Sequence, residues 1–162
     1  MTLQPSMESR GHPSQGKPRG IDRSAAGAHN LPMESQHLSV HIRRSVGAVY
    51  DYASNPENLP DWAEGLSAGI ELVNGHWVSI APMGKVIVEM IEHNELGVLD
   101  HWVTTPEGDA FYNPMRVIEA DGGSEVIFTL RRQPGMSDDA FEADAIAIVT
   151  DLSTLKEILE RH

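Results

Sequence analysis

Hydrophobic and polar residues alternate where the ordered part of the sequence begins. In "HLSVHIR", Leu38, Val40 and Ile42 are separated by polar residues, which predicts a half-buried strand. Ser45 is a suitable helix N-cap, and apolar residues at helical spacing follow it as far as Ala53. The pattern therefore predicts a strand followed by a helix.

Two prolines then interrupt the helical pattern in "SNPENLPDWAEGL". Asn55 can cap a short helix that has Pro56 at its first position, and Pro60 can begin another turn in the same way. Proline is tolerated there because its missing amide N–H would be unpaired anyway. Gly65 is placed to end the second turn, so we expect two short helices.

Short apolar runs separated by turn sequences occupy the next part of the chain. The turns are "NG", "PMG", "NELG", "PEGD" and "DGG", which are typical of an antiparallel meander. With the first strand, the runs predict about seven strands. The other runs are residues 68–73, 76–81, 85–92, 98–104, 110–119 and 125–132.

The last segment has the spacing of one long helix. Ser137 is its expected N-cap, and two acidic residues follow at the positive end of the helix dipole. From Phe141 to Leu159 apolar residues recur at alternating spacings of four and three, which gives one apolar stripe. We expect this helix to run nearly to His162.

Residues 1–35 differ from the rest of the chain in composition. They are rich in Pro, Gly, Ser and His and show no apolar periodicity, so we interpret them as a disordered tail. Residues 36–162 then form one domain, without a repeat or a second core. Because Met7 and Met33 lie in the tail, the biological start could be Met1, Met7 or Met33.

The predicted domain is strongly acidic. The chain has a net charge of −12, and the tail carries four basic and three acidic residues, so the domain carries −13. This charge argues against nucleic acid and anionic membrane surfaces as partners. The chain has no cysteine, which excludes disulfides and cysteine-based metal sites and suits the cytoplasm. No apolar run approaches the roughly 20 residues of a membrane helix.

The order of elements and several phrases resemble the START-like superfamily. This group is also called SRPBCC, the polyketide cyclase and lipid transport group or the birch-pollen-allergen-like group. The resemblance covers about residues 36–162 and rests on "VYDYASNPENLPDWAEGL", "DHWVTTPEGDAFYNPMRV", "GSEVIFTLRR" and "DLSTLKEILE". The chain is most similar to bacterial polyketide-cyclase-type members.

The resemblance implies an α+β helix-grip fold. In this fold a curved antiparallel sheet grips the long C-terminal helix over an apolar cavity, and the two short helices close one end. Aromatic side chains bind planar apolar ligands well, although ordinary core packing is the alternative for Trp62 and Trp77. The expected ligand-binding residues are Trp62, Val88, Met90, Trp102, Tyr112, Asn113 and Phe128.

Two residues are candidates for catalysis. His101 lies beside Asp100, and a carboxylate can orient an imidazole for acid–base chemistry. However, neighbouring residues on a strand point to opposite faces, so this pair cannot form simply. Arg116 is the other candidate, because with Tyr112 and Asn113 it could fix a ligand's carboxylate or phenol.

Structural ion pairs are the alternative for the basic residues of this region. Asp144 and Asp151 lie seven residues apart on one border of the apolar stripe, and arginines of the sheet could pair with them. The histidines show no metal-ligand spacing, so we expect neither a metal nor a cofactor.

The superfamily's functions differ widely, so the fold does not choose among them. Our first expectation is binding, or transport, of a small hydrophobic or aromatic molecule such as a lipid or polyketide. The alternatives are an enzyme resembling polyketide cyclases and aromatases, and a protein-interaction module. The sequence leaves open whether any reaction is catalysed and whether the protein is a monomer or a homodimer.

Overall fold

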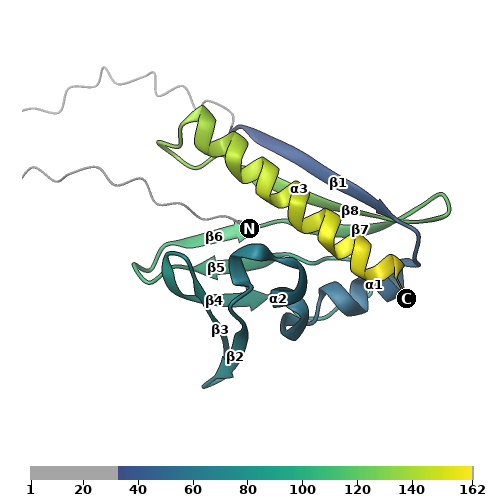
Figure 1. Cartoon of the computed structure of the whole chain (residues 1–162), viewed down its shortest axis with the longest axis horizontal. Coiled ribbons are helices and arrows are strands. Elements are labelled where there is room, and N and C mark those ends of the chain that lie inside the picture. Colours follow the sequence, from purple (N-terminus) through teal and green to yellow (C-terminus); the bar gives the residue numbers. More distant parts are fainter. Residues whose placement is uncertain (1–32, 162) are drawn as a thin grey trace, which may run out of the picture.

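The computed structural model describes residues 33–161, and Figure 1 shows its helices and strands. Most of the expected tail therefore lies outside the described residues. The elements are β1 (Ser35–Ile42), α1 (Val46–Ala53), the 3-10 turn η1 (Pro56–Asn58), α2 (Leu59–Trp62), the 3-10 turn η2 (Glu64–Leu66), β2 (Ile70–Val73), β3 (His76–Ala81), β4 (Gly84–Met90), β5 (His101–Thr104), β6 (Ala110–Asn113), β7 (Met115–Ala120), β8 (Gly123–Arg131) and α3 (Asp138–Glu160).

The strands pair antiparallel throughout. Strands β2 to β6 form a meander in chain order, and β7 pairs with β8, which pairs with β1. The two groups are continuous at their junction, because Leu99 N–H donates to Met115 O and Val117 N–H donates to Gly97 O. The residues that these bonds pair follow the same antiparallel register as His101 and Asn113 in the β5–β6 pair. One curved sheet therefore runs from β2 to β1, which confirms the expected architecture.

Pro114 separates β6 from β7, which were expected as one strand over residues 110–119. Proline has no N–H to donate to a ladder, so it interrupts regular pairing. The next N–H, of Met115, donates to the side-chain Oδ1 of Asp100 at 2.9 Å. The structure consequently has eight strands among its described residues, where the sequence predicted about seven.

The two prolines of the second helical segment act largely as expected. Asn55 Oδ1 accepts from Glu57 N–H at 3.1 Å and caps η1, and Pro60 lies in the first turn of α2. The expected end at Gly65 is wrong, because Gly65 lies inside η2. The helical turns end before Gly69, whose φ of +109° is in the range that favours glycine.

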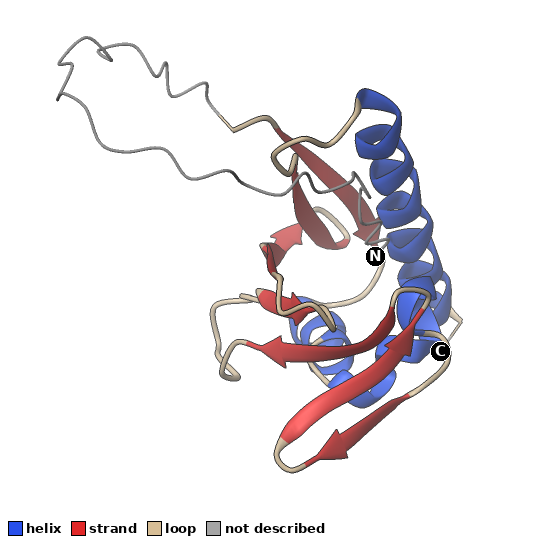
Figure 2. Ribbon diagram, turned by 90° about the vertical axis from the view of Figure 1, so that its left-hand side faces the viewer, coloured by secondary structure: helices blue, strands red, loops and turns tan. Residues whose placement is uncertain are grey.

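The long helix α3 matches its prediction. Ser137 caps it by accepting from Ala140 N–H at 3.2 Å, and the helix runs from Asp138 to Glu160. It packs against β1 and β8, and α2 also contacts it. Figure 2 shows α3 along one side of the molecule, with the strands facing it from the other.

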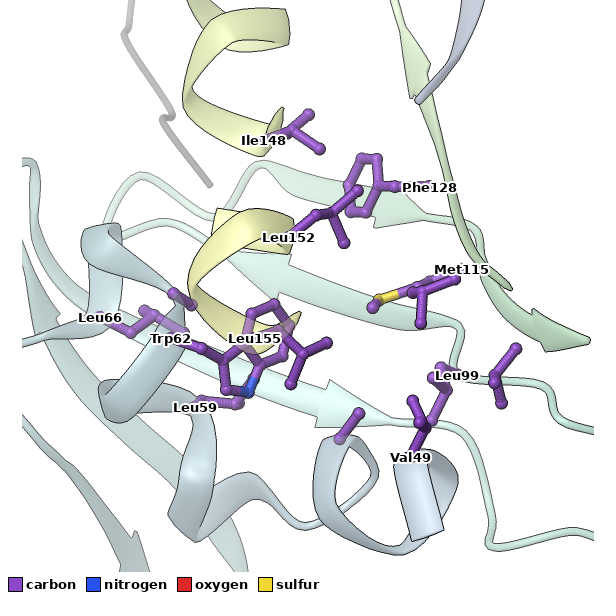
Figure 3. Packing of buried hydrophobic residues seen from close by; sticks show 14 of the residues in the cluster. Val49, Leu59, Trp62, Leu66, Leu99, Met115, Phe128, Ile148, Leu152 and Leu155 are labelled. Atoms are coloured by element: carbon purple, nitrogen blue, oxygen red, sulfur yellow. The ribbon is translucent and has the colours of Figure 1, made fainter. Parts of the chain in front are cut away.

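The space between the sheet and α3 is filled by apolar side chains. In Figure 3, Ile148 and Leu152 of α3 point toward Phe128 of β8, and the same view labels Trp62 of α2 and Leu155 of α3. All five side chains are buried. The concave face of the sheet, the short helices and α3 therefore share one core, and the functional site must be sought inside it.

Candidate functional site

A small, partly enclosed cavity lies between the sheet, the short helices and α3. Its walls come from the segment that spans α2 and η2, from strands β4, β5 and β8, and from α3. Its volume, measured as the space open to the centre of a water molecule, is about 20 Å³, enough for one water molecule. The lining residues are Leu59, Trp62, Ala63, Leu66, Val88, His101, Phe128, Ile148, Asp151 and Leu152.

His101 is one of two ionisable side chains in this lining. It is only 4 % exposed, and its Nδ1 lies 3.0 Å from the carbonyl oxygen of Leu99. A carbonyl oxygen only accepts hydrogen bonds, so Nδ1 carries the proton of the neutral ring. Burial lowers the pKa of His101 to about 4, which keeps the imidazole neutral near pH 7.

Asp151 is the other ionisable side chain of the lining. It lies on α3, is 4 % exposed, and its Oδ1 accepts the backbone N–H of Glu64 at 3.0 Å. Glu64 begins η2, so this bond ties the short helical segment to α3. The carboxylate therefore holds one wall of the cavity against another.

Trp62 supplies a third polar atom. Its side chain is 7 % exposed, and its indole Nε1 is buried with no hydrogen-bond acceptor in the described part of the chain. Buried N–H groups usually have a partner, and an unsatisfied one costs free energy. The cavity thus combines mostly apolar walls with a carboxylate, a neutral imidazole and an indole donor.

A separate polar cluster lies on the opposite, outer face of the sheet. Asp100 accepts from the Tyr112 hydroxyl and from the Arg116 guanidinium, in addition to Met115 N–H. The Trp102 and Tyr112 rings lie 4.8 Å apart, and the Arg131 guanidinium lies 5.3 Å from the Tyr112 ring. These contacts support the sheet where Pro114 interrupts it.

The structure brings together only part of the site that the sequence suggested. Trp62, Val88, Phe128 and the catalytic candidate His101 line the cavity. Met90 is half-buried at the edge of the core, and Asn113 is buried with its Nδ2 3.4 Å from Phe111 O. Three other suggested residues do not line the cavity, since they belong to the outer cluster: Trp102, Tyr112 and Arg116.

The strand alternation explains this division. Asp100 and His101 are neighbours on opposite faces, as predicted, so the carboxylate joins the outer cluster while the imidazole lines the cavity. Trp102 follows Asp100 outward and is 38 % exposed. The alternation that separates Asp100 from His101 also places Trp102 outside.

Six of the ten lining residues were not among the site residues expected from the sequence, and Asp151 is the one of these six that is ionisable. Its position on the border of the apolar stripe was visible, but an ion pair with an arginine of the sheet was expected. Arg116 pairs instead with Asp100, and Arg132 pairs with Glu34 and with Asp138 at the start of α3. An ion pair with α3 does exist, but it joins Asp138 to Arg132, the residue directly after β8.

A second hollow of about 520 Å³ lies near the start of α3 and is largely open to solvent. Charged groups such as Glu34, Arg132 and Asp138 surround it, and they pair with one another. Among residues 33–161, no group of three or more His, Cys, Asp or Glu side chains is placed to hold a metal ion. In the same part of the chain, no helix has the length and apolar character needed to cross a membrane.

No family model and no curated protein matches the sequence of the chain. Solved structures do match. The protein XoxI from Bacillus cereus has a TM-score of 0.61 at 18% identity, over 79% of this chain and 96% of that one. Ara h 8.0201 has a TM-score of 0.58 at 12% identity, over 80% and 99% of the two chains.

DynU16, from the dynemicin biosynthetic locus, has a TM-score of 0.60 at 13% identity. The match covers 80% of this chain and 48% of DynU16. Identities this low show a shared fold and nothing finer. The chain therefore has the START-like, helix-grip fold that we expected from its sequence.

Proposed function

We propose that this domain binds a small hydrophobic or aromatic molecule, such as a lipid or a polyketide, in the cavity beneath α3. The observation that supports the proposal is the partly enclosed cavity, whose ten lining residues are apolar except for His101 and Asp151. Mostly apolar linings with a few polar groups are typical of small-molecule sites, although such sites are usually larger.

Binding requires the cavity to widen, because it has room for only about one water molecule. Four of its lining residues lie in the segment 59–66, which consists of α2 and the short turn η2. So short a helix has little stability of its own. Outward movement of this segment is therefore the simplest way to admit a ligand.

Titration with a neutral, environment-sensitive dye such as Nile red tests the proposal. We expect saturable binding with about one site per chain and a melting temperature that rises with dye concentration. Trp62→Ala should raise the affinity several-fold, because the space that it opens no longer depends on movement of α2.

Trp102→Ala is the matched control for this experiment. It also replaces a tryptophan, but one on the outer face of the sheet, so dye affinity should stay at the wild-type value. Circular dichroism would verify that both variants fold. Absence of binding to both the wild-type protein and Trp62→Ala would refute the proposal and favour an interaction module.

An enzyme acting on a hydrophobic substrate is the second candidate, because His101 and Asp151 line the same cavity. A buried neutral imidazole can accept or relay a proton, and one neighbour in fold comes from a biosynthetic locus. Under this alternative, once a substrate is known, His101→Ala should lower kcat by about 100-fold or more while the protein stays folded. A binding protein should lose little affinity with the same change.

A further inference from the structure

We propose that two copies of this protein associate through the outer face of the sheet, on a row of four side chains that is complementary to itself. The row consists of Arg131, Tyr112, Trp102 and Glu89. It lies on the face of the sheet opposite to the cavity. The inference is therefore independent of the proposed function, and its failure would not affect it.

The strand register places the four side chains in one line across the sheet. Glu89 of β4 is paired with Trp102 of β5, and Trp102 is paired with Tyr112 of β6. Side chains of directly opposed residues lie on the same face of a sheet. Arg131 of β8 continues the line, because its guanidinium lies 5.3 Å from the Tyr112 ring. The order across the sheet is therefore cation, ring, ring, anion.

All four side chains can be reached from outside. Trp102 is 38 % exposed, Arg131 and Glu89 are exposed, and Tyr112 is half-buried. The two rings lie 4.8 Å apart and form one aromatic surface. Tryptophan, tyrosine and arginine are the residue types most enriched at the centres of protein interfaces. The row thus has the composition of an interface centre.

The charges at the two ends of the row are available to another molecule. Among residues 33–161 no ion pair joins Arg131 to a carboxylate, and its guanidinium contacts the Tyr112 ring instead. Glu89 lies 4.0 Å from His76 Nδ1, a pair that is ionic only when the imidazole is protonated. Arg131 can therefore bind a carboxylate of a second molecule, and Glu89 can bind a cation.

Two-fold symmetry makes the row complementary to itself. A two-fold axis along the strands, midway between Tyr112 and Trp102, reverses the order of the row in the second copy. Tyr112 of each copy then faces Trp102 of the other. Arg131 and Glu89 lie about one and a half strand spacings, roughly 7 Å, on either side of this axis. Each Arg131 consequently faces Glu89 of the other copy, and the contact contains two aromatic pairs and two ion pairs.

The curvature of the sheet limits the contact to this row and its surroundings. Sheets that pack face to face keep their strands within about 30° of each other, so the match is closest near the axis. Arginine and glutamate side chains are long enough to span the remaining offset. A small interface between two acidic domains gives a weak dimer, and we expect a dissociation constant of roughly 1 to 500 µM.

Analytical ultracentrifugation of the full-length protein from about 1 µM to about 500 µM measures this association. We expect monomer at the lowest concentration and an increasing share of dimer as the concentration rises. Arg131→Glu and Glu89→Arg should each raise the dissociation constant by about tenfold or more, because symmetry turns two attractive contacts into two repulsive ones. The double variant restores opposite charges, so its dissociation constant should return to within a few-fold of the wild-type value.

Glu142→Arg is the matched control for Glu89→Arg. It changes the net charge equally at an exposed position on α3, away from the outer face of the sheet, and should leave the dissociation constant unchanged. Trp102→Ala removes a central ring without changing a charge and should weaken the dimer several-fold. It provides the test should a charge variant fail to fold, as circular dichroism would show.

Four results would overturn the proposal. They are a wild-type protein that stays monomeric at about 500 µM, a dimer that neither single charge variant weakens, a double variant as weak as the single ones, and a dimer unchanged by Trp102→Ala. Weakening by both single variants together with recovery in the double variant would establish that Arg131 of one copy faces Glu89 of the other.

Discussion

Asp144 illustrates how a single buried carboxylate contributes to the pH dependence of stability. It lies about two turns before Asp151 on α3 and is 7 % exposed. Burial raises its pKa from 3.8 to about 6, because the charged form loses solvation. Since the pKa is higher in the folded state, ionisation of Asp144 opposes folding. The penalty is absent below about pH 4 and complete above about pH 6.

Asp144→Asn should therefore stabilise the protein at about pH 8 and have little effect at about pH 4. The expected gain is at most about 3 kcal/mol, which corresponds to a pKa shift of about two units. Urea unfolding at both pH values measures it. His101 contributes in the opposite direction, because its lowered pKa weakens the fold as pH falls from about 6.5 toward 4. This contribution cancels, because each variant is compared with the wild type at the same pH.

The exposed Asp139 on the same helix is the control for this prediction. Asp139→Asn should not produce the same gain at high pH, because Asp139 is not buried. An Asp144→Asn variant that is equally stabilised at both pH values would contradict the assignment of the effect to ionisation.

Individual residues also show how far the sequence could predict the site. Alternation within the strands correctly gave Val88 and Phe128 as inward-facing, and it separated Asp100 from His101. Trp102 was assigned to the ligand because of its side chain, although its position in the strand already placed it outside. Residue type was the weaker guide, and strand position the stronger one.

At the scale of elements, the break at Pro114 connects the outer polar cluster to the cavity. Met115 N–H donates to Asp100, while the carbonyl of Leu99, its neighbour across the ladder, accepts from His101 Nδ1. The interruption thus leaves a backbone acceptor that orients the imidazole. The expected strand 110–119 contained this proline, so the interruption was visible in the sequence, but the partner Asp100 was not.

Asp100→Ala should destabilise the protein by about 3 kcal/mol or more, because it leaves a buried N–H of Met115 and the Tyr112 hydroxyl without their acceptor. Asp100→Asn should cost less, since its side-chain oxygen can still accept from Met115. Denaturant unfolding of the two variants gives the comparison. A cost below about 1 kcal/mol for Asp100→Ala would show that the cluster contributes little.

The long helix α3 was the element that the sequence predicted most fully. Its N-cap and the apolar stripe along its length both match the structure. Ser137, Phe141 and Leu159 lie where the pattern put them. The partner of Asp151 was not predictable in the same way. Whether a carboxylate on the border of a stripe meets an arginine or the N–H of Glu64 depends on contacts between residues far apart in the chain. The local spacing of apolar residues carries no information about such contacts.

For the molecule as a whole, the described residues form one main apolar core. Every side chain of the main apolar cluster lies between Ile42 and Leu159, and the sheet and α3 close around it. The described part of the chain begins near Glu34, whose carboxylate pairs with Arg132 and whose carbonyl accepts from Arg132 N–H at 2.9 Å. Among the described residues, Glu34 thus contacts the fold next to β1.

Deletion of residues 1–32 should accordingly leave the melting temperature within about 2 °C of the full chain, because composition predicts that they bury little apolar surface. A longer deletion that ends at His37 is the matched control. It also removes Glu34 and the first residues of β1, which pair with Thr129, Leu130 and Arg131 of β8. We expect the longer deletion to lower the melting temperature by several degrees, as scanning calorimetry would measure. A comparable drop with the shorter deletion would mean that residues 1–32 contribute to the folded domain, against the composition argument.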